Sequence, residues 1–386
     1  MSRLDRCYSI ADLRKAAKKR LPKGVFEFID RGTEDEVGLA ANREAFHRLK
    51  LRTRFLVDLS KRDMGTELFG QRINLPIGIA PTGIAGLCWY QGELGLAKAA
   101  AAAGIPFTLA STSLTPMDAI AKEAGGRLWF QQYMWKETHL NYEMIARARD
   151  LGFEALVVTI DTALGRLREH NDRNGFVIPF SMTPRFAIDM MRHPGWLANV
   201  MLRYLATNGY PRHENHPAQY QRIMAPTPTP ERNSGMTWEE IDRLRKLWPR
   251  KLIVKSILCA EDAKQAVDHG ADAVVVSNHG GRAMDSAVAT IDVLPEVVAE
   301  VGDRTTVLLD SGIRRGSDIV KALALGAKAV LIGRATLYGT AVAGEAGAAK
   351  AIEMLGTEFE KTMGYIGCRY ISEISREIFA RSPPRF

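Results

Sequence analysis

An imidazole and a guanidinium stand three positions apart in the stretch SNHGGR, residues 277–282. The residues just before it, Ala273–Val276, are small or apolar and predict a buried strand. A histidine at a strand end can exchange a proton near neutral pH, and an arginine can hold a carboxylate through two parallel hydrogen bonds. His279 and Arg282 therefore indicate acid–base chemistry on an anionic substrate.

Eight short apolar runs predict the frame that positions these side chains. They occupy residues 75–81, 105–111, 128–133, 154–161, 251–256, 272–278, 305–312 and 328–334. Helical patterns fill gaps between them at 92–104, 139–152, 259–270 and 315–326. Apolar strands that alternate with amphipathic helices indicate a parallel sheet covered on both faces. Eight such units predict an α/β fold, a (β/α)8 TIM barrel.

A doubly wound sheet is the competing architecture, and the polar residues at the ends of the runs favour the barrel instead. In a barrel, the C-terminal strand ends converge on one mouth, where barrel enzymes carry their sites. We expect residues 1–386 to form one such domain with one pocket. The polar or turn-forming residues at these ends are Pro81, Thr82, Ser111, Gln131, Tyr133, Thr159, Asp161, Lys255, Ser277, Asp310, Gly333 and Arg334.

Two turns rich in glycine and arginine follow the last two predicted strands. They read DSGIRRG at residues 310–316 and IGRATL at residues 332–337. Backbone N–H groups at helix starts, together with guanidinium groups, bind phosphate dianions. The two turns together predict a phosphorylated cofactor.

Composition excludes several classes of protein. The 386 residues carry a formal charge of +8, but the basic residues are scattered and no nucleic-acid-binding module stands out, so we expect no nucleic-acid partner. The four cysteines lack metal-ligand spacing and predict reduced thiols of an intracellular protein, with no metal site. No apolar run approaches the roughly 18 residues of a membrane-spanning helix, and no signal peptide is indicated, so any membrane contact is expected to be peripheral.

The ordered motifs SNHGGR, DSGIRRG and IGR, preceded by RLPKGVFEFIDRGTEDE at residues 20–36, resemble the family of FMN-dependent 2-hydroxy-acid oxidising enzymes. The likeness runs from about Tyr8 to about Ile371 and is closest to the (S)-mandelate and membrane L-lactate dehydrogenase branches. It implies one barrel that binds FMN at its C-terminal face, commonly as a homotetramer. The implied reaction is oxidation of an L-(S)-2-hydroxy acid, mandelate-like or lactate-like, to the 2-oxo acid.

The resemblance also implies the catalytic residues. His279 matches the family's base, and Asp161 matches the carboxylate that orients the imidazole and stabilises its charged form. Tyr133 matches the phenol that hydrogen-bonds the substrate hydroxyl. Oxidising a 2-hydroxy acid needs a base to accept a proton, which is the role that the resemblance implies for His279.

Substrate-binding residues follow from the same likeness. Arg168 and Arg282 match the two guanidiniums that hold the substrate carboxylate, whereas neighbouring Arg166 is expected to be solvated. Phe28 stands where the family usually has a tyrosine that helps to hold this carboxylate. Ala110 replaces the family's usual serine after the second strand. We expect both departures to affect specificity more than catalysis.

The residues implied to contact FMN lie at the strand ends and in the two glycine-rich turns. Lys255 matches the ammonium near flavin N1, and a lysine in a buried strand is costly unless it is paired with an anion. Gly83 replaces an alanine of many small-acid oxidases and matches the mandelate branch, which favours a larger pocket for the substrate side chain. The alternative is that the turn alone requires glycine at this position. The implied set is Pro81, Thr82, Gly83, Gln131, Thr159, Lys255, Ser277, Asp310, Gly312, Arg314, Gly333 and Arg334.

Residues 175–236, between the fourth and fifth predicted strands, form an unusually long connection. They combine large apolar side chains with six arginines and only three acidic residues, a composition that can lie in a bilayer interface. Membrane-bound members of the family carry their anchor at this place. We therefore expect peripheral attachment to the cytoplasmic side of the inner membrane, with a quinone or another respiratory carrier as electron acceptor.

Two alternatives stay open at this stage. If residues 175–236 form a lid or a subunit contact, the protein is expected to be cytoplasmic and to act as an oxidase that reduces oxygen to hydrogen peroxide. A catalytically silent FMN-binding barrel is suggested only by Phe28 and Ala110.

Overall fold

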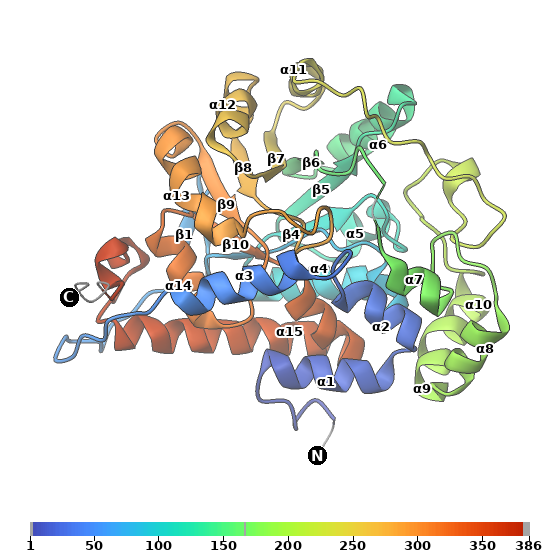
Figure 1. The fold of residues 1–386 in the computed structure, drawn as a ribbon, viewed down its shortest axis with the longest axis horizontal. Coiled ribbons are helices and arrows are strands. Elements are labelled where there is room, and N and C mark those ends of the chain that lie inside the picture. Colours follow the sequence, from blue (N-terminus) through green and yellow to red (C-terminus); the bar gives the residue numbers. More distant parts are fainter. Residues whose placement is uncertain (1–2, 166, 381–386) are drawn as a thin grey trace.

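The computed structural model describes residues 3–165 and 167–380, so Arg166 lies outside the described residues. Its centre is a closed barrel of eight parallel strands (Figure 1). Each strand pairs with the next along the chain, and the last pairs with the first. This order confirms the predicted TIM barrel and excludes the doubly wound sheet. The strands are β3 (Ile77–Ile79), β4 (Phe107–Ala110), β5 (Leu128–Tyr133), β6 (Ala155–Thr159), β7 (Lys251–Ile257), β8 (Ala273–Val276), β9 (Thr306–Leu309) and β10 (Ala329–Ile332).

The two-residue period of the strands separates an inner face from an outer face. One buried cluster fills the barrel and includes Trp129, Val157, Ile253, Val275, Leu308 and Leu331. The alternating residues, such as Phe130, Leu156 and Val254, pack outward under the helices. Because every second residue points inward, the next inward-facing positions toward the C-terminal mouth can be read from the same strands. They are polar residues or glycine. These positions are Gln131, Tyr133, Thr159, Lys255, Ser277, Asp310 and Gly333.

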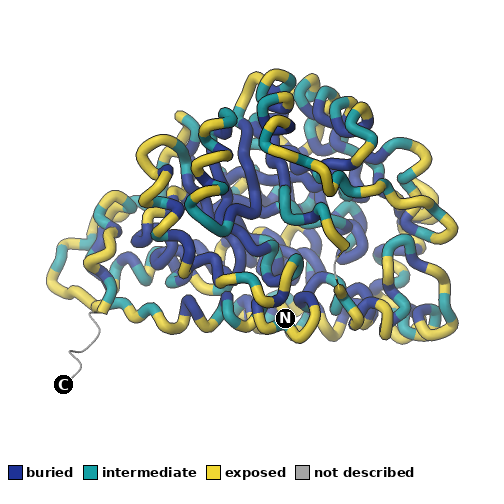
Figure 2. Tube along the Cα trace, turned by 45° about the horizontal axis from the view of Figure 1, so that its top comes forward, coloured by how far each residue is buried: buried dark blue, intermediate teal, exposed yellow. Residues whose placement is uncertain are grey.

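Helices cover the outside of the barrel, as Figure 2 shows by the exposed residues around its buried centre. The four predicted helices are confirmed to within two residues at each end. They correspond to α4, α6, α12 and α14. The covering helices are α4 (Gly92–Ala103), α5 (Met117–Glu123), α6 (Thr138–Asp150), α11 (Glu239–Leu247), α12 (Ala260–Asp268), α13 (Thr290–Val301), α14 (Gly316–Ala324) and α15 (Arg334–Tyr365), the last kinked at Ala343 and Gly344.

The chain before the barrel forms a hairpin and three helices. A hairpin of β1 (Thr66–Leu68) and β2 (Gln71–Ile73) places Leu68 and Ile73 in the cluster that fills the barrel. Helices α1 (Ile10–Arg20), α2 (Lys23–Asp30) and α3 (Val37–Arg48) precede it. Asp30, at the end of α2, accepts hydrogen bonds from Arg14 at 2.6 Å and from Tyr338 of α15 at 2.7 Å. Burial alone would raise the pKa of Asp30, but these bonds outweigh it and lower the pKa.

The long connection between β6 and β7 forms a helical lobe at one edge of the molecule (Figure 1). It contains α7 (Glu169–Asn174), α8 (Pro184–Met191), α9 (Pro194–Trp196), a π-helical turn (Leu197–Leu202), α10 (Arg203–Thr207) and a 3-10 turn (Ala218–Tyr220). Further 3-10 turns span Ala85–Leu87, Ile371–Glu373 and Arg376–Ile378. No helix within residues 3–165 and 167–380 combines the length and apolar character needed to cross a membrane.

Candidate active site

A cavity of about 610 Å³ opens at the C-terminal ends of the barrel strands. Of the predicted site residues, fourteen line it: Phe28, Pro81, Thr82, Gly83, Tyr133, Arg168, Lys255, His279, Arg282, Asp310, Gly312, Arg314, Gly333 and Arg334. The other four lie at the ends of strands β5, β6 and β8, next to these lining residues: Gln131, Thr159, Asp161 and Ser277. The fold thus brings together side chains spread over some 300 residues of sequence.

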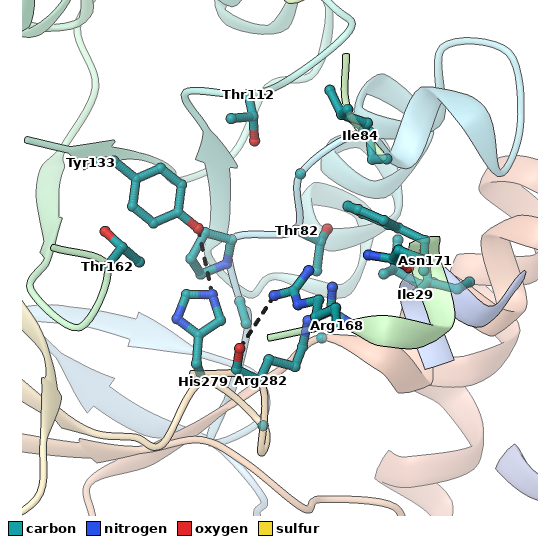
Figure 3. A pocket seen from close by; sticks show the side chains of 18 of the residues that line it. Ile29, Thr82, Ile84, Thr112, Tyr133, Thr162, Arg168, Asn171, His279 and Arg282 are labelled. Carbon is teal, nitrogen blue, oxygen red and sulfur yellow. Dashed lines mark hydrogen bonds between the residues drawn. The ribbon is translucent and has the colours of Figure 1, made fainter. Parts of the chain in front are cut away.

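His279 lies between the carboxylate of Asp161 and the phenol of Tyr133, and Figure 3 shows the side that faces Tyr133. Its Nδ1 is 3.0 and 3.1 Å from the two carboxylate oxygens of Asp161, and its Nε2 is 3.5 Å from the hydroxyl of Tyr133. Because an ionised carboxylate only accepts hydrogen bonds, Nδ1 carries a proton, and in the neutral imidazole Nε2 therefore keeps its lone pair. This geometry suits a general base that faces the cavity.

The loop after β8 holds His279 in an unusual backbone conformation. His279 has a φ of +57°, and its N–H donates to the hydroxyl of Ser277 at 3.1 Å. Gly280 and Gly281 follow with φ of +70° and +69°. A Cβ on Gly281 would lie 2.6 Å from the backbone nitrogen of Leu39, a distance that real Cβ contacts do not show. The turn therefore favours glycine at both positions, and the close approach of α3 requires it at Gly281.

Two guanidinium groups share one aromatic platform. The guanidinium carbons of Arg282 and Arg168 lie 5.4 and 5.8 Å from the ring centroid of Phe28. Arg282 donates to the carbonyl of Arg31 at 2.9 Å, and Arg168 donates to the carbonyl of Arg282 at 3.3 Å (Figure 3). Phe28, which offers no hydroxyl to a substrate, instead orients both cations by cation–π contact. Two guanidiniums on one wall suit a carboxylate ligand.

Lys255 supplies an ammonium group to the floor of the cavity. It is 3 % exposed, lies 3.0 Å from the carboxylate of Asp310 and donates to Ser277 at 2.7 Å. The anion that the sequence requires for this buried lysine is thus provided by the protein itself. The pair joins β7 to the end of β9 beneath His279.

Gln131 and Thr159 fit the edge of a bound cofactor. Within the described part of the chain, both amide atoms of Gln131 and the hydroxyl of Thr159 are buried and have no hydrogen-bond partner. Leaving such groups unsatisfied is costly, so the position calls for a ligand with donors and acceptors along one edge. The pyrimidine edge of a flavin has this character. These residues and Lys255 would therefore hold the ring of FMN.

The phosphate end of the predicted cofactor site lies where α14 and α15 begin. Gly312, Arg314 and Gly333 line the cavity there, and a Cβ on Gly333 would meet nothing closer than 3.5 Å. Arg334 donates instead to the carbonyls of Ile29, Gly280 and Arg31, at 3.1, 2.8 and 3.0 Å. Burial lowers the pKa of Arg334 to about 10. Its guanidinium ties α2 to the His279 loop, and direct contact with a phosphate stays a prediction.

Several cavity residues were missed by the sequence analysis, and four of them bear on the site: Thr112, His213, His216 and Arg232. Nδ1 of His213 lies 3.0 Å from the carbonyl of Thr112, and burial lowers the pKa of His213 to about 4. Three of the four belong to residues 175–236, which were interpreted as one membrane-binding unit. The signal available was HENH at residues 213–216, two histidines close together near the end of that segment.

Comparisons with known proteins agree with this geometry. Residues 17–381 match the family described as FMN-dependent dehydrogenase. The (S)-mandelate dehydrogenase of Pseudomonas putida is 40% identical over 371 residues, which cover 95% of this chain and 92% of that protein. The L-lactate oxidase of Nostoc sp. is 38% identical over 376 residues, 95% of this chain and 96% of that one. The crystal structure of the monotopic membrane protein (S)-mandelate dehydrogenase has a TM-score of 0.91 at 39% identity and covers 98% of this chain and 100% of that chain.

His213 generates a stability prediction. Its pKa falls from the ordinary 6.5 to about 4, so between these pH values the unfolded chain takes up a proton that the folded protein does not. Stability is therefore lost as the pH falls through this window, by about 2 kcal/mol at pH 5. His213→Asn keeps a donor for the Thr112 carbonyl but cannot titrate. We expect its melting temperature to fall less from pH 7 to pH 5 than that of the wild type; equal falls would contradict the prediction.

Proposed function

The chain belongs to the FMN-dependent dehydrogenase family, and from this premise we propose that it oxidises an L-(S)-2-hydroxy acid with a mandelate-like or lactate-like side chain and passes the electrons to a membrane quinone or similar carrier. The observation that carries the proposal is one cavity in which the His279–Asp161 pair faces two guanidiniums. The first group can move a proton, and the second can hold the carboxylate beside the reacting carbon.

The roles of the side chains follow from their positions. Arg168 and Arg282 would bind the substrate carboxylate, and Tyr133 would hydrogen-bond its hydroxyl. His279 Nε2 accepts the hydroxyl proton, and the carboxylate of Asp161 stabilises the imidazolium that results. Bound FMN supplies the two-electron acceptor for the reaction.

A catalytically silent barrel finds no support in the site. Ala110, the last residue of β4, is buried and pairs in register with Gln131. Neither Ala110 nor Phe28 disturbs the contact between His279 and Asp161. The similar proteins of this family are dehydrogenases and oxidases, and the chain is an enzyme of the same kind.

The wall beside Gly83 supports a bulky substrate side chain. A Cβ on Gly83 would lie 2.4 Å from the hydroxyl oxygen of Thr112, which also lines the cavity. Alanine at this position would therefore displace the Thr112 side chain. Apolar residues complete the wall around this space: Ile84, Leu164, Val177, Ile178 and Pro179. We propose a mandelate-like aryl acid as the preferred substrate.

The outer face of the helical lobe supports membrane attachment. Its exposed side chains include several that are large and apolar, and the exposed arginines Arg185, Arg192 and Arg203 stand among them. This combination favours the interface of an anionic bilayer. The apolar residues, with their exposed fractions, are Met191 (64%), Tyr210 (62%), Leu202 (53%), Ile188 (46%) and Leu205 (43%).

The similar (S)-mandelate dehydrogenase is a monotopic membrane protein, which supports peripheral attachment of this enzyme as well. We propose that it lies on the cytoplasmic side of the inner membrane and forms a homotetramer. Similarity to an L-lactate oxidase favours a second candidate, a cytoplasmic enzyme that reduces oxygen to hydrogen peroxide. Reoxidising the reduced enzyme with oxygen and then with a quinone analogue distinguishes the two by their relative rates.

The first test of the function is anaerobic reduction of the FMN-bound protein. L-Mandelate or L-lactate is expected to bleach the flavin absorbance of the wild type. His279→Ala should keep its flavin but lose about 10²–10⁴-fold in the rate of reduction, since this variant lacks the base. Stopped-flow absorbance measures both. A near-normal rate of flavin reduction in the variant would show that His279 is not the base. A wild-type flavin that no 2-hydroxy acid bleaches would refute the function.

Gly83→Ala tests the proposed size of the substrate. By forcing Thr112 into the cavity, it should lower kcat/KM for mandelate about tenfold and affect lactate less. Adding Thr112→Ala removes the collision and should restore the rate with mandelate. Adding Thr112→Val, which keeps the volume, should not. Equal losses with both acids would show that Gly83 serves only the turn.

The membrane proposal predicts the location of a charged variant. Met191→Glu combined with Leu202→Glu should shift the protein from sedimented membranes to the supernatant, because two charges would enter the bilayer interface. The flavin of the variant should still be reduced at the wild-type rate. Leu56→Glu, at an exposed leucine outside the lobe, is the matched control. Retention of the double variant on membranes would argue against this surface.

A further inference from the structure

Arg232 stands where the long connection returns to the barrel. Its backbone bridges that of Trp135 in an antiparallel pair. On either side, Lys136 N–H donates to the carbonyl of Glu231 at 3.0 Å, and Asn233 N–H donates to the carbonyl of Met134 at 3.1 Å. Met134 and Trp135 directly follow Tyr133, the last residue of β5. This short ladder fixes Arg232 next to the phenol of the candidate active site.

The guanidinium of Arg232 stacks on that phenol. Its central carbon lies 4.4 Å from the centroid of the Tyr133 ring, closer than either Arg168 or Arg282 lies to Phe28. The Tyr133 ring is in turn nearly parallel to the imidazole of His279, with an interplanar angle of 16°. The cation therefore acts on the one ring whose hydroxyl faces the base.

The surroundings of Arg232 strengthen this contact. His213 and His216 are buried on the same wall of the cavity. Burial is the main reason that their pKa values are lowered, and the nearby charge of Arg232 lowers them further. Both imidazoles are thus neutral at neutral pH. A cation–π contact is stronger where the cation is shielded from water.

We propose that Arg232 is a positioning residue that acts through Tyr133. Stacked on the ring, it holds the phenol toward Nε2 of His279 and draws electron density from the ring. The phenol becomes a stronger hydrogen-bond donor to the substrate oxygen as His279 removes the hydroxyl proton. Because negative charge on that oxygen grows only as the proton leaves, the contact favours the transition state over the bound substrate. The inference rests on the proposed function and adds a residue to its site.

A double-mutant cycle with Tyr133 tests the proposal. Arg232→Met should slow anaerobic flavin reduction by about 5–30-fold while changing the dissociation constant of L-mandelate less than about threefold. Arg232→Lys, which retains a cation, should recover part of the rate. In a Tyr133→Phe background, Arg232→Met should cost less than about twofold, because the hydroxyl through which it acts is gone. Arg173→Met, at an exposed arginine of α7, is the control for removing a charge from the connection.

Several results would overturn the proposal. Equal rate losses from Arg232→Met with and without the Tyr133 hydroxyl would show that the two residues act independently. A change confined to the dissociation constant would make Arg232 a substrate-binding residue instead. Flavin content and melting temperature identify any variant that fails to fold. If Arg232→Met fails to fold, the rates of Arg232→Gln, which lacks the charge, and Arg232→Lys, which keeps it, are compared instead. A wild type that is not bleached refutes the proposed function and this inference together, whereas a bleached wild type without coupling refutes only the inference.

Discussion

The hydrogen bond between Asp161 and His279 is the contact on which the rest of the site depends. Its two partners follow β6 and β8, which are not neighbours in the barrel, so the bond forms only if β7 takes its place between them. β7 itself contributes Lys255, which donates to Ser277 and pairs with Asp310 at the end of β9. Four consecutive strands thus fix the position of the His279 imidazole, whose Nε2 we propose to be the proton acceptor. No short segment could fix that position alone.

A second constraint comes from outside the barrel. Arg334 gathers the carbonyls of Ile29, Arg31 and Gly280, and so joins α2 to the loop that carries His279. The carbonyl of Arg31 also accepts from Arg282, and Phe28 of α2 lies under both guanidiniums that we propose to bind the substrate. Carbonyl dipoles and an aromatic face stabilise these like-charged cations on the same wall. The substrate site is therefore built between the barrel mouth and α2 rather than by the strands alone.

These two constraints explain how much could be predicted from the sequence. The barrel, its eight strands and the surrounding helices follow from local hydrophobic patterns, and the residues at the strand ends inherit their convergence from the fold. The role of Phe28 as a platform, and the use of Arg334 to bind carbonyls, depend on contacts between segments that no pattern records. His213, His216 and Arg232 were missed for the same reason. They belong to residues 175–236, which were interpreted from amino-acid composition alone. Composition does not separate the residues that face the barrel from those that face solvent.

The two faces of that connection are physically separate. On the inner face, the indole N–H of Trp196 donates to the carbonyl of Leu87 at 2.7 Å, and the ring of Tyr204 packs on Tyr90, with its hydroxyl close to Gly86. Arg232 makes the corresponding contact with Tyr133. The exposed side chains of α8 and α10, such as Met191 and Leu205, take no part in these contacts. Substitutions on the outer face are therefore expected to leave the active site in place, whereas Arg232 on the inner face lines its cavity.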